Sequence, residues 1–257
     1  MTTFIDTHCH FDFAPFRGNE AESLQLAAEA GVEKIIVVSV AADRFAGVMD
    51  LTRRWPALYA ALGTHPMAIA QHEEAHLQQL EDYLKQQPEK LVAIGEIGLD
   101  LYIENPQFDK QQAVLDAQLR LAKHYNLPAI LHSRRTHDKL AMHLRKIDLP
   151  ACGVVHGFAG SEQQAQAFVR AGYAIGVGGT LTYERASKTR NAISRLPLTS
   201  LLLETDSPDM PLRGFQGQPN RPERIRHVWQ SLCEIRDESP QEIAETLREN
   251  TRRIFGI

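Results

Sequence analysis

A short apolar run followed by an amphipathic stretch recurs eight times along this chain, and this repeat constrains the fold more than any other feature. The runs cover residues 4–10, 34–40, 58–66, 91–100, 127–134, 152–158, 173–179 and 201–208. Their length and β-branched content suit strands that are buried on both faces. Eight near-regular βα units in 257 residues predict a single-domain (β/α)8 TIM barrel over residues 1–257.

A doubly wound open sheet is the alternative, but it requires a glycine-rich phosphate turn after the first strand, and none follows residues 4–10. No Pro/Gly/Ser-rich linker interrupts the chain, so no internal domain boundary is expected. Capping boxes that begin at Ser161 and Ser239 predict helix starts. An apolar stripe from Ile243 to Ile254 predicts a closing helix.

Composition indicates an ordinary globular protein without a membrane segment. Hydrophobic residues make up 43% and charged residues 23%, and the formal net charge is −4. The first residues contain Asp6 and two histidines where a signal peptide would have its apolar core. Three cysteines without a CxxC pair fit a reducing compartment. We therefore expect a cytoplasmic protein, and a monomer because no heptad or long apolar patch demands a partner.

Polar side chains gather at the carboxyl ends of the predicted strands, where the active sites of such barrels lie. They are four imidazoles and two carboxylates: His8, His10, Glu96, His132, His156 and Asp206. This set is too polar for a packed core and suits two divalent cations. Side chains alternate along a strand, so His8 and His10 should both point into the barrel, while Cys9 should point outward as a small buried residue.

Other polar residues near these ends are expected to support the ligands. Asp6 lies two residues before His8, so its side chain should also point into the barrel, and it is expected to orient a ligating histidine. Glu204 lies two residues before Asp206 and is expected to support it in the same way. His65 and Asp100 are assigned the same supporting role. The remaining histidines are expected on solvated helix surfaces: His72, His76, His124, His137, His143 and His227.

The segments FIDTHCHFDF, LGTHP, IGEIGLD, ILHSR, HGFAGS and LLETDSP resemble, in order, the signatures of the TatD-type metal-dependent deoxyribonucleases within the amidohydrolase-like barrels. Among them, the chain is most similar to the YjjV-type bacterial members. The resemblance implies that His8, His10 and Asp206 hold one metal. It implies that His132 and His156 hold the other and that Glu96 bridges the two.

The sequence departs from the family pattern at three points. Leu101 follows Asp100 where the family often has Tyr or Phe, so that the aromatic residue comes one position later, at Tyr102. Asn220-Arg221-Pro222 replaces Asn-Glu-Pro, and Gly157 replaces the cysteine that follows the histidine of the sixth run. These changes affect the rim and leave the implied ligands intact.

Metal-assisted hydrolysis follows from this arrangement. Two cations would acidify a water molecule, and Asp206 would accept its proton and pass it to the leaving oxygen, with Glu96 as the second catalytic carboxylate. Imidazole-rich ligation suits Zn, Mn, Ni or Fe. The DNases of the family are described as Mg-dependent, so the identity of the two ions stays open.

Arginines and aromatic residues in the rim loops suit phosphate contact and base stacking, although they also suit ordinary loop surfaces. The expected substrate contacts are Arg17, Tyr102, Arg134, Arg213 and Asn220. Together with the resemblance, they predict a phosphodiesterase acting on DNA as a 3′–5′ exonuclease. Two alternatives remain: a small-molecule amidohydrolase or lactonase acting on an ester or amide with the same metals, and a metal-binding barrel that binds a partner without turnover. A mononuclear iron oxygenase would need only two histidines and one carboxylate.

Overall fold

Each of the eight predicted strands pairs in parallel with the next along the chain in the computed structural model, which describes residues 1–257. The strands are β1 (Phe4–Cys9), β2 (Val32–Val38), β3 (Leu58–Leu62), β4 (Leu91–Asp100), β5 (Ala129–Arg134), β6 (Gly153–Val155), β7 (Ala174–Val177) and β8 (Leu201–Leu203). The predicted (β/α)8 barrel is confirmed, and the open-sheet alternative is wrong.

The barrel closes between its first and last strands through a short contact beyond the regular ladder. Cys9 bridges Ser207, the His10 amide donates to the Ser207 carbonyl at 2.8 Å, and the Asp206 amide donates to the His8 carbonyl at 2.8 Å. Closure therefore depends on the same segments that carry the candidate ligands.

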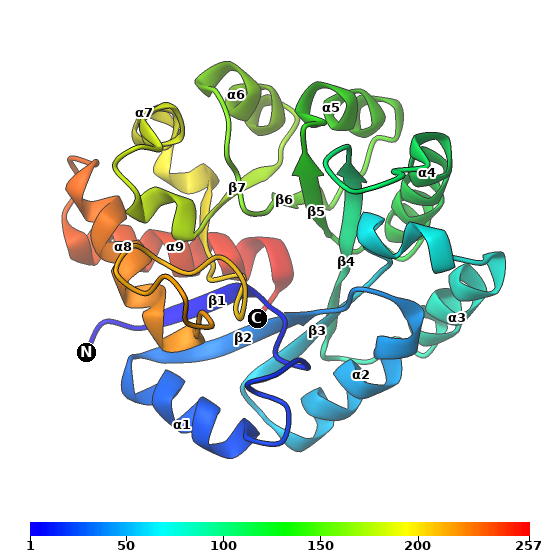
Figure 1. Ribbon diagram of the computed structural model, residues 1–257, viewed down its shortest axis with the longest axis horizontal. Helices are drawn as coiled ribbons and strands as arrows, with labels where there is room; N and C mark the ends of the chain where they lie inside the picture. The colour runs from blue at the N-terminus through cyan, green and yellow to red at the C-terminus, as the bar shows by residue number, and fades with distance from the viewer.

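Helices surround the strands (Figure 1). They are α1 (Glu20–Glu29), α2 (Phe45–Arg54), α3 (Glu74–Lys85), α4 (Phe108–His124), α5 (His137–Lys146), α6 (Glu162–Arg170), α7 (Ser187–Arg195), α8 (Ile225–Glu234) and α9 (Pro240–Phe255). The capping box at Ser161 is confirmed, since its hydroxyl and the Gln164 side chain each accept the other residue's amide. Ser239 caps α9 by accepting the Glu242 amide, but its own amide does not donate to the Glu242 side chain, so the predicted capping box is only half formed. No helix combines the length and apolar composition needed to span a membrane.

Two apolar layers fill the molecule. The larger lies between strands and helices and includes Cys9, Phe45 and Phe168. The smaller includes Ile36, Ile130 and Leu202 and fills the barrel itself. Cys9 is fully buried in the outer layer, which confirms the predicted alternation along β1.

The predicted runs extend past the observed strands at their carboxyl ends. β3 ends at Leu62, β6 at Val155 and β8 at Leu203, so His65, His156 and Asp206 lie in the loops that follow. The backbone turns there: Gly157 has φ 54° and Asp206 has φ 58°, both in the left-handed region. The ladder thus stops where the chain begins to present its polar side chains.

The last helix covers one end of the barrel. Phe255 is buried against the inner layer, and Ile254 and Ile257 pack beside it. The chain ends near the barrel axis (Figure 1). The buried Asn250 amide donates to the carbonyls of Leu198 and Leu201, which ties α9 to the start of β8.

Replacing Phe255 with alanine should lower the free energy of unfolding by about 3 kcal/mol, because it leaves a cavity under the barrel. Urea denaturation measures this. Arg252→Ala, on the exposed side of the same helix, should change stability by less than about 0.5 kcal/mol. Equal effects of the two substitutions would contradict a role of α9 as the closing element.

Candidate metal centre

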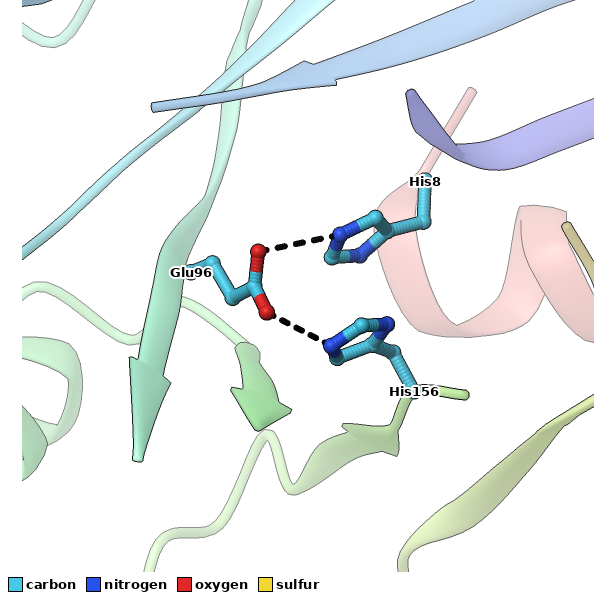
Figure 2. A group of neighbouring side chains, drawn as sticks. All are labelled: His8, Glu96 and His156. Carbon is cyan, nitrogen blue, oxygen red and sulfur yellow. Dashed lines mark hydrogen bonds and ion pairs between the residues drawn. The ribbon is translucent and has the colours of Figure 1, made fainter. Parts of the chain in front are cut away.

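The buried carboxylate of Glu96 lies between two groups of imidazoles. Glu96 is 1% exposed and projects from β4 toward the rings of His8 and His156 (Figure 2). Its Oε2 lies 3.1 Å from His8 Nε2 and 3.4 Å from His10 Nε2. Its Oε1 lies 2.6 Å from His156 Nε2 and 3.1 Å from His132 Nδ1. Each carboxylate oxygen therefore faces a different pair of nitrogens.

Asp206 completes the first of these groups. Its Oδ1 lies 3.3 Å from the Nε2 atoms of both His8 and His10. This oxygen is buried and makes no well-directed hydrogen bond. All six candidate ligands thus meet at one end of the barrel, divided into His8, His10 and Asp206 on one side of Glu96 and His132 and His156 on the other.

The hydrogen bonds of His132 leave a lone pair facing the site. Its Nε2 lies 2.7 Å from Asp100 Oδ2, and a carboxylate accepts, so this nitrogen carries the proton. Metal binding requires a neutral ring, and its lone pair is then on Nδ1, which faces Glu96 Oε1 and lies 3.4 Å from His156 Nε2. Asp100 therefore fixes the orientation of the His132 ring.

His65 has the opposite arrangement. Its Nδ1 accepts the Met67 amide at 2.9 Å, so the neutral ring carries its proton on Nε2. That nitrogen lies 3.2 Å from Glu96 Oε1. Burial lowers the pKa of His65 and keeps it neutral, despite the nearby Glu96. His65 thus supports the Glu96 carboxylate and has no lone pair to offer a metal, although it lies within ligand distance of Glu96 and His132.

Asp6 acts on the main chain and contacts no imidazole. Its Oδ1 accepts the amides of His8 at 3.2 Å and Thr205 at 3.0 Å, and its Oδ2 accepts the Thr205 hydroxyl at 2.6 Å. Burial raises the pKa of Asp6 to about 7, although these hydrogen bonds act in the opposite direction. Asp6 therefore fixes the backbone of β1 against the segment after β8.

Glu204 lies beside His156, whereas the sequence placed it in relation to Asp206. Its Oε1 accepts the Gly157 amide and is 3.6 Å from His156 Nδ1. A glycine at position 176 makes room for it, because a Cβ there would come within 2.5 Å of Glu204 Oε2. The expected contact with Asp206 is absent. The chain turns at Asp206, so the side chains of Glu204 and Asp206 do not share one face of a strand.

The electrostatics of the cluster favour protonated imidazoles and ionised carboxylates. Burial disfavours the charged form of His10, but the nearby carboxylates of Asp206 and Glu96 prevail and raise its pKa to about 10. The same balance raises the pKa of His156 well above its usual value. Burial would raise the pKa values of Glu96 and Asp206, but the surrounding histidines hold both well below the usual range.

These residues fit divalent cations. Imidazole nitrogens and carboxylate oxygens are suitable donors, and the buried Asp206 Oδ1 is an acceptor that the protein itself leaves unsatisfied. A carboxylate with each oxygen facing a separate donor group suits a bridge between two ions.

Comparison with known proteins gives the family. The family model described as TatD related DNase matches residues 5–256. The chain belongs to the TatD family. It is 61% identical to the uncharacterized metal-dependent hydrolase YjjV of Escherichia coli K12, over 99% of this chain and 98% of the relative.

A crystal structure of the E. coli YjjV protein superposes with a TM-score of 0.98, covering 99% of this chain and 98% of that one. A 3′-5′ ssDNA/RNA exonuclease TatD from Rahnella sp. is 30% identical over 94% of each chain. Family membership and the donor set together make this chain a metal-dependent hydrolase of the TatD family.

Two buried glutamines of α4 support the site of this TatD-family member, and sequence reasoning missed both. Gln111 accepts the Asp100 amide at 2.8 Å and donates to the Asp100 carbonyl at 2.9 Å. Gln118 accepts the Thr64 amide at 2.7 Å, next to His65. Their spacing of seven residues puts them on one helix face. The sequence signal that could have revealed them is a polar amide at two positions of the helix face that otherwise packs into the core.

The predicted substrate contacts divide into exposed and buried residues. Arg17, Tyr102, Arg134 and Arg213 are exposed, and Arg213 is paired with Glu184 at 2.8 Å. The prediction for Asn220 is wrong, because its side chain is fully buried. Its amide donates to the carbonyls of Thr205 and Met210, where the loop after β8 lacks ladder partners.

Two of the histidines assigned to solvated surfaces are buried, so those predictions are wrong. His143 lies between α5 and α4, with its Nδ1 2.6 Å from Asp116 Oδ1. His72 lies in the turn before α3. His76 and His137 are half-buried, and the predictions for His124 and His227 are confirmed, since both are exposed.

Metal uptake should release protons, because the raised imidazole pKa values mean that cations compete with protons for the same nitrogens. Affinity should therefore fall as the pH falls from about 8 to about 6. Calorimetric titration of metal-stripped protein with Zn²⁺ or Mn²⁺, in two buffers of different ionisation enthalpy, counts the protons. A binding enthalpy independent of the buffer would contradict this account.

Substituting Asp100→Asn should weaken metal binding about tenfold, because the uncharged amide holds His132 less firmly. Titration of metal-stripped protein with Mn²⁺ measures the affinity. Asp138→Asn, an exposed change of the same kind on α5, is the control and should leave it unchanged. Equal affinity in the two variants would rule out the orienting role of Asp100.

Proposed function

We propose that this protein is a phosphodiesterase that hydrolyses single-stranded nucleic acid from its 3′ end with two divalent cations. The observation that carries the proposal is the Glu96 carboxylate, whose two oxygens face two separate donor groups. The match to a family described as DNase covers nearly the whole chain, and a relative named as a 3′-5′ exonuclease aligns over 94% of it.

The ligand assignment follows the two groups around Glu96. His8, His10 and Asp206 would hold one cation, His132 and His156 would hold the other, and Glu96 would contact both. Bound cations would supply an electrophile for a phosphoryl oxygen and would lower the pKa of a water molecule.

Asp206 is the residue suited to move the proton. The neighbouring histidines keep its carboxylate ionised, and its side chain is 17% exposed, so it can be reached from the rim. It would accept a proton from the attacking water and return it to the leaving oxygen. Glu96 is suited to a static role, because both of its oxygens are engaged and almost no part of it is exposed.

The surrounding contacts keep these groups in place for attack. Asp100 fixes the His132 ring, and the Met67 amide fixes His65 beside Glu96, so neither histidine needs to reorient during the reaction. Exposed arginines on the rim favour an anionic substrate over a neutral ester, amide or lactone. A phosphodiester combines that charge with a bond that this type of centre can hydrolyse.

Asp206→Asn should lower kcat on a 5′-labelled single-stranded DNA about 10³-fold, because it removes the proton acceptor. Elemental analysis should show that most metal is retained. Asp237→Asn, an exposed change between α8 and α9, should keep full activity. An Asp206→Asn variant with near-normal kcat would refute the assignment of the base.

The same labelled DNA separates this function from its alternatives. Protein loaded with Mg²⁺, Mn²⁺ or Zn²⁺ should shorten the strand from the 3′ end one nucleotide at a time. Turnover of a carboxyl ester, lactone or amide without DNA cleavage would replace the proposal with the small-molecule hydrolase. Metal-loaded protein that turns over none of these substrates would favour the partner-binding barrel.

A further inference from the structure

Two consecutive arginines contact one aromatic ring just beyond the metal centre. The guanidinium carbon of Arg134 lies 3.7 Å from the centroid of the Tyr102 ring, and that of Arg135 lies 4.5 Å from it. Tyr102 is 52% exposed, and both arginines are exposed. The ring thus holds two like charges close together at the rim.

The backbone is bent to bring both arginines to this ring. Successive side chains of a strand point to opposite faces, so Arg134 at the end of β5 and its neighbour would ordinarily diverge. Arg135 instead has φ 58°, a left-handed conformation that is unfavourable for a long side chain. The Leu101 amide donates to the Arg134 carbonyl, which fixes this corner against the segment that carries Tyr102.

Neither guanidinium forms a direct ion pair, although Arg134 is near enough to help lower the pKa of the Asp100 carboxyl. No carboxylate lies within 4.0 Å of Arg134 or Arg135, and neither side chain makes a hydrogen bond within the protein. The stack of Arg44 on Phe13 differs, because Arg44 is bound to the Asp12 carboxylate at 2.9 Å. The donors at Tyr102 are therefore ordered by the ring and free to bind an anion.

The position of this cluster relates it to the metal centre. Arg134 lies two residues after His132 on β5, so both side chains leave the strand on the same face. Their Cα atoms are about 6.6 Å apart along the strand. Asp100 links the two, because one of its oxygens accepts from His132 and the other accepts the Tyr102 amide at 2.7 Å.

We propose that Tyr102, Arg134 and Arg135 form a phosphate subsite that binds the phosphodiester next to the one being cleaved. The inference rests on the proposed nuclease function and adds to it a preference for substrates with at least two phosphodiesters. A dinucleotide or a small aryl phosphodiester leaves this subsite empty, whereas a trinucleotide fills it.

Steady-state kinetics on thymidine di- and trinucleotides test the subsite, with bis(p-nitrophenyl) phosphate as a second single-phosphodiester substrate. Arg134→Gln and Arg135→Gln should each raise KM for the trinucleotide about tenfold and leave kcat and the single-phosphodiester substrates unchanged. Tyr102→Leu should resemble them, while Tyr102→Phe, which keeps the ring, should behave as wild type. Arg145→Gln, an equal charge change at the far end of α5, is the control.

Binding of fluorescent thymidine oligonucleotide to metal-stripped protein provides a readout that does not depend on turnover. The slope of log affinity against log salt should become shallower by about 0.7 in the Arg134→Gln, Arg135→Gln double variant, the value for one phosphate of a single strand. An unchanged slope, or an equal rise in KM for substrates with one and two phosphodiesters, would overturn the subsite. Absence of DNA cleavage by the wild type, with the slope changes intact, would refute only the nuclease function.

Discussion

The burial of the Glu96 carboxylate is the constraint on which the rest of the site depends. A carboxylate removed from water is costly unless positive or hydrogen-bonding groups surround it. Four imidazoles of the candidate ligand set approach it, and His65 adds a fixed donor. Either protons on the imidazoles or bound cations can balance this charge, so protons and metal ions compete for the same nitrogens.

That cluster requires an irregular backbone, and polar side chains stabilise the irregularity. The strands stop before His65, His156 and Asp206, which leaves amides and carbonyls without ladder partners. Gln118, Asn220 and other buried side chains pair with these groups. The amide-bearing residues around the rim thus hold the backbone that carries the ligands, although none of them touches the centre.

The fold was predictable from the sequence because its signals are local. Apolar runs mark strands, alternation places His8 and His10 on one face, and the capping box at Ser161 marks a helix start. Asn220 and His143 were misassigned because their partners lie in other segments, and only the packed structure brings those segments together. The role of His65 needed one more fact, the amide of Met67 at its Nδ1, which decides where the proton lies.

The metal centre by itself does not select a substrate. A phosphodiester and a carboxyl ester each offer an oxygen to an electrophile and a bond to an attacking water, so the same ligands serve both. Selection must come from groups that contact the substrate away from the reacting atoms. At this rim such groups are exposed cations, and the Tyr102 ring with its two free guanidinium groups is ordered before any ligand arrives. An ordered pair of charges favours a substrate whose own charges repeat at a fixed distance, and a nucleic acid strand has this property.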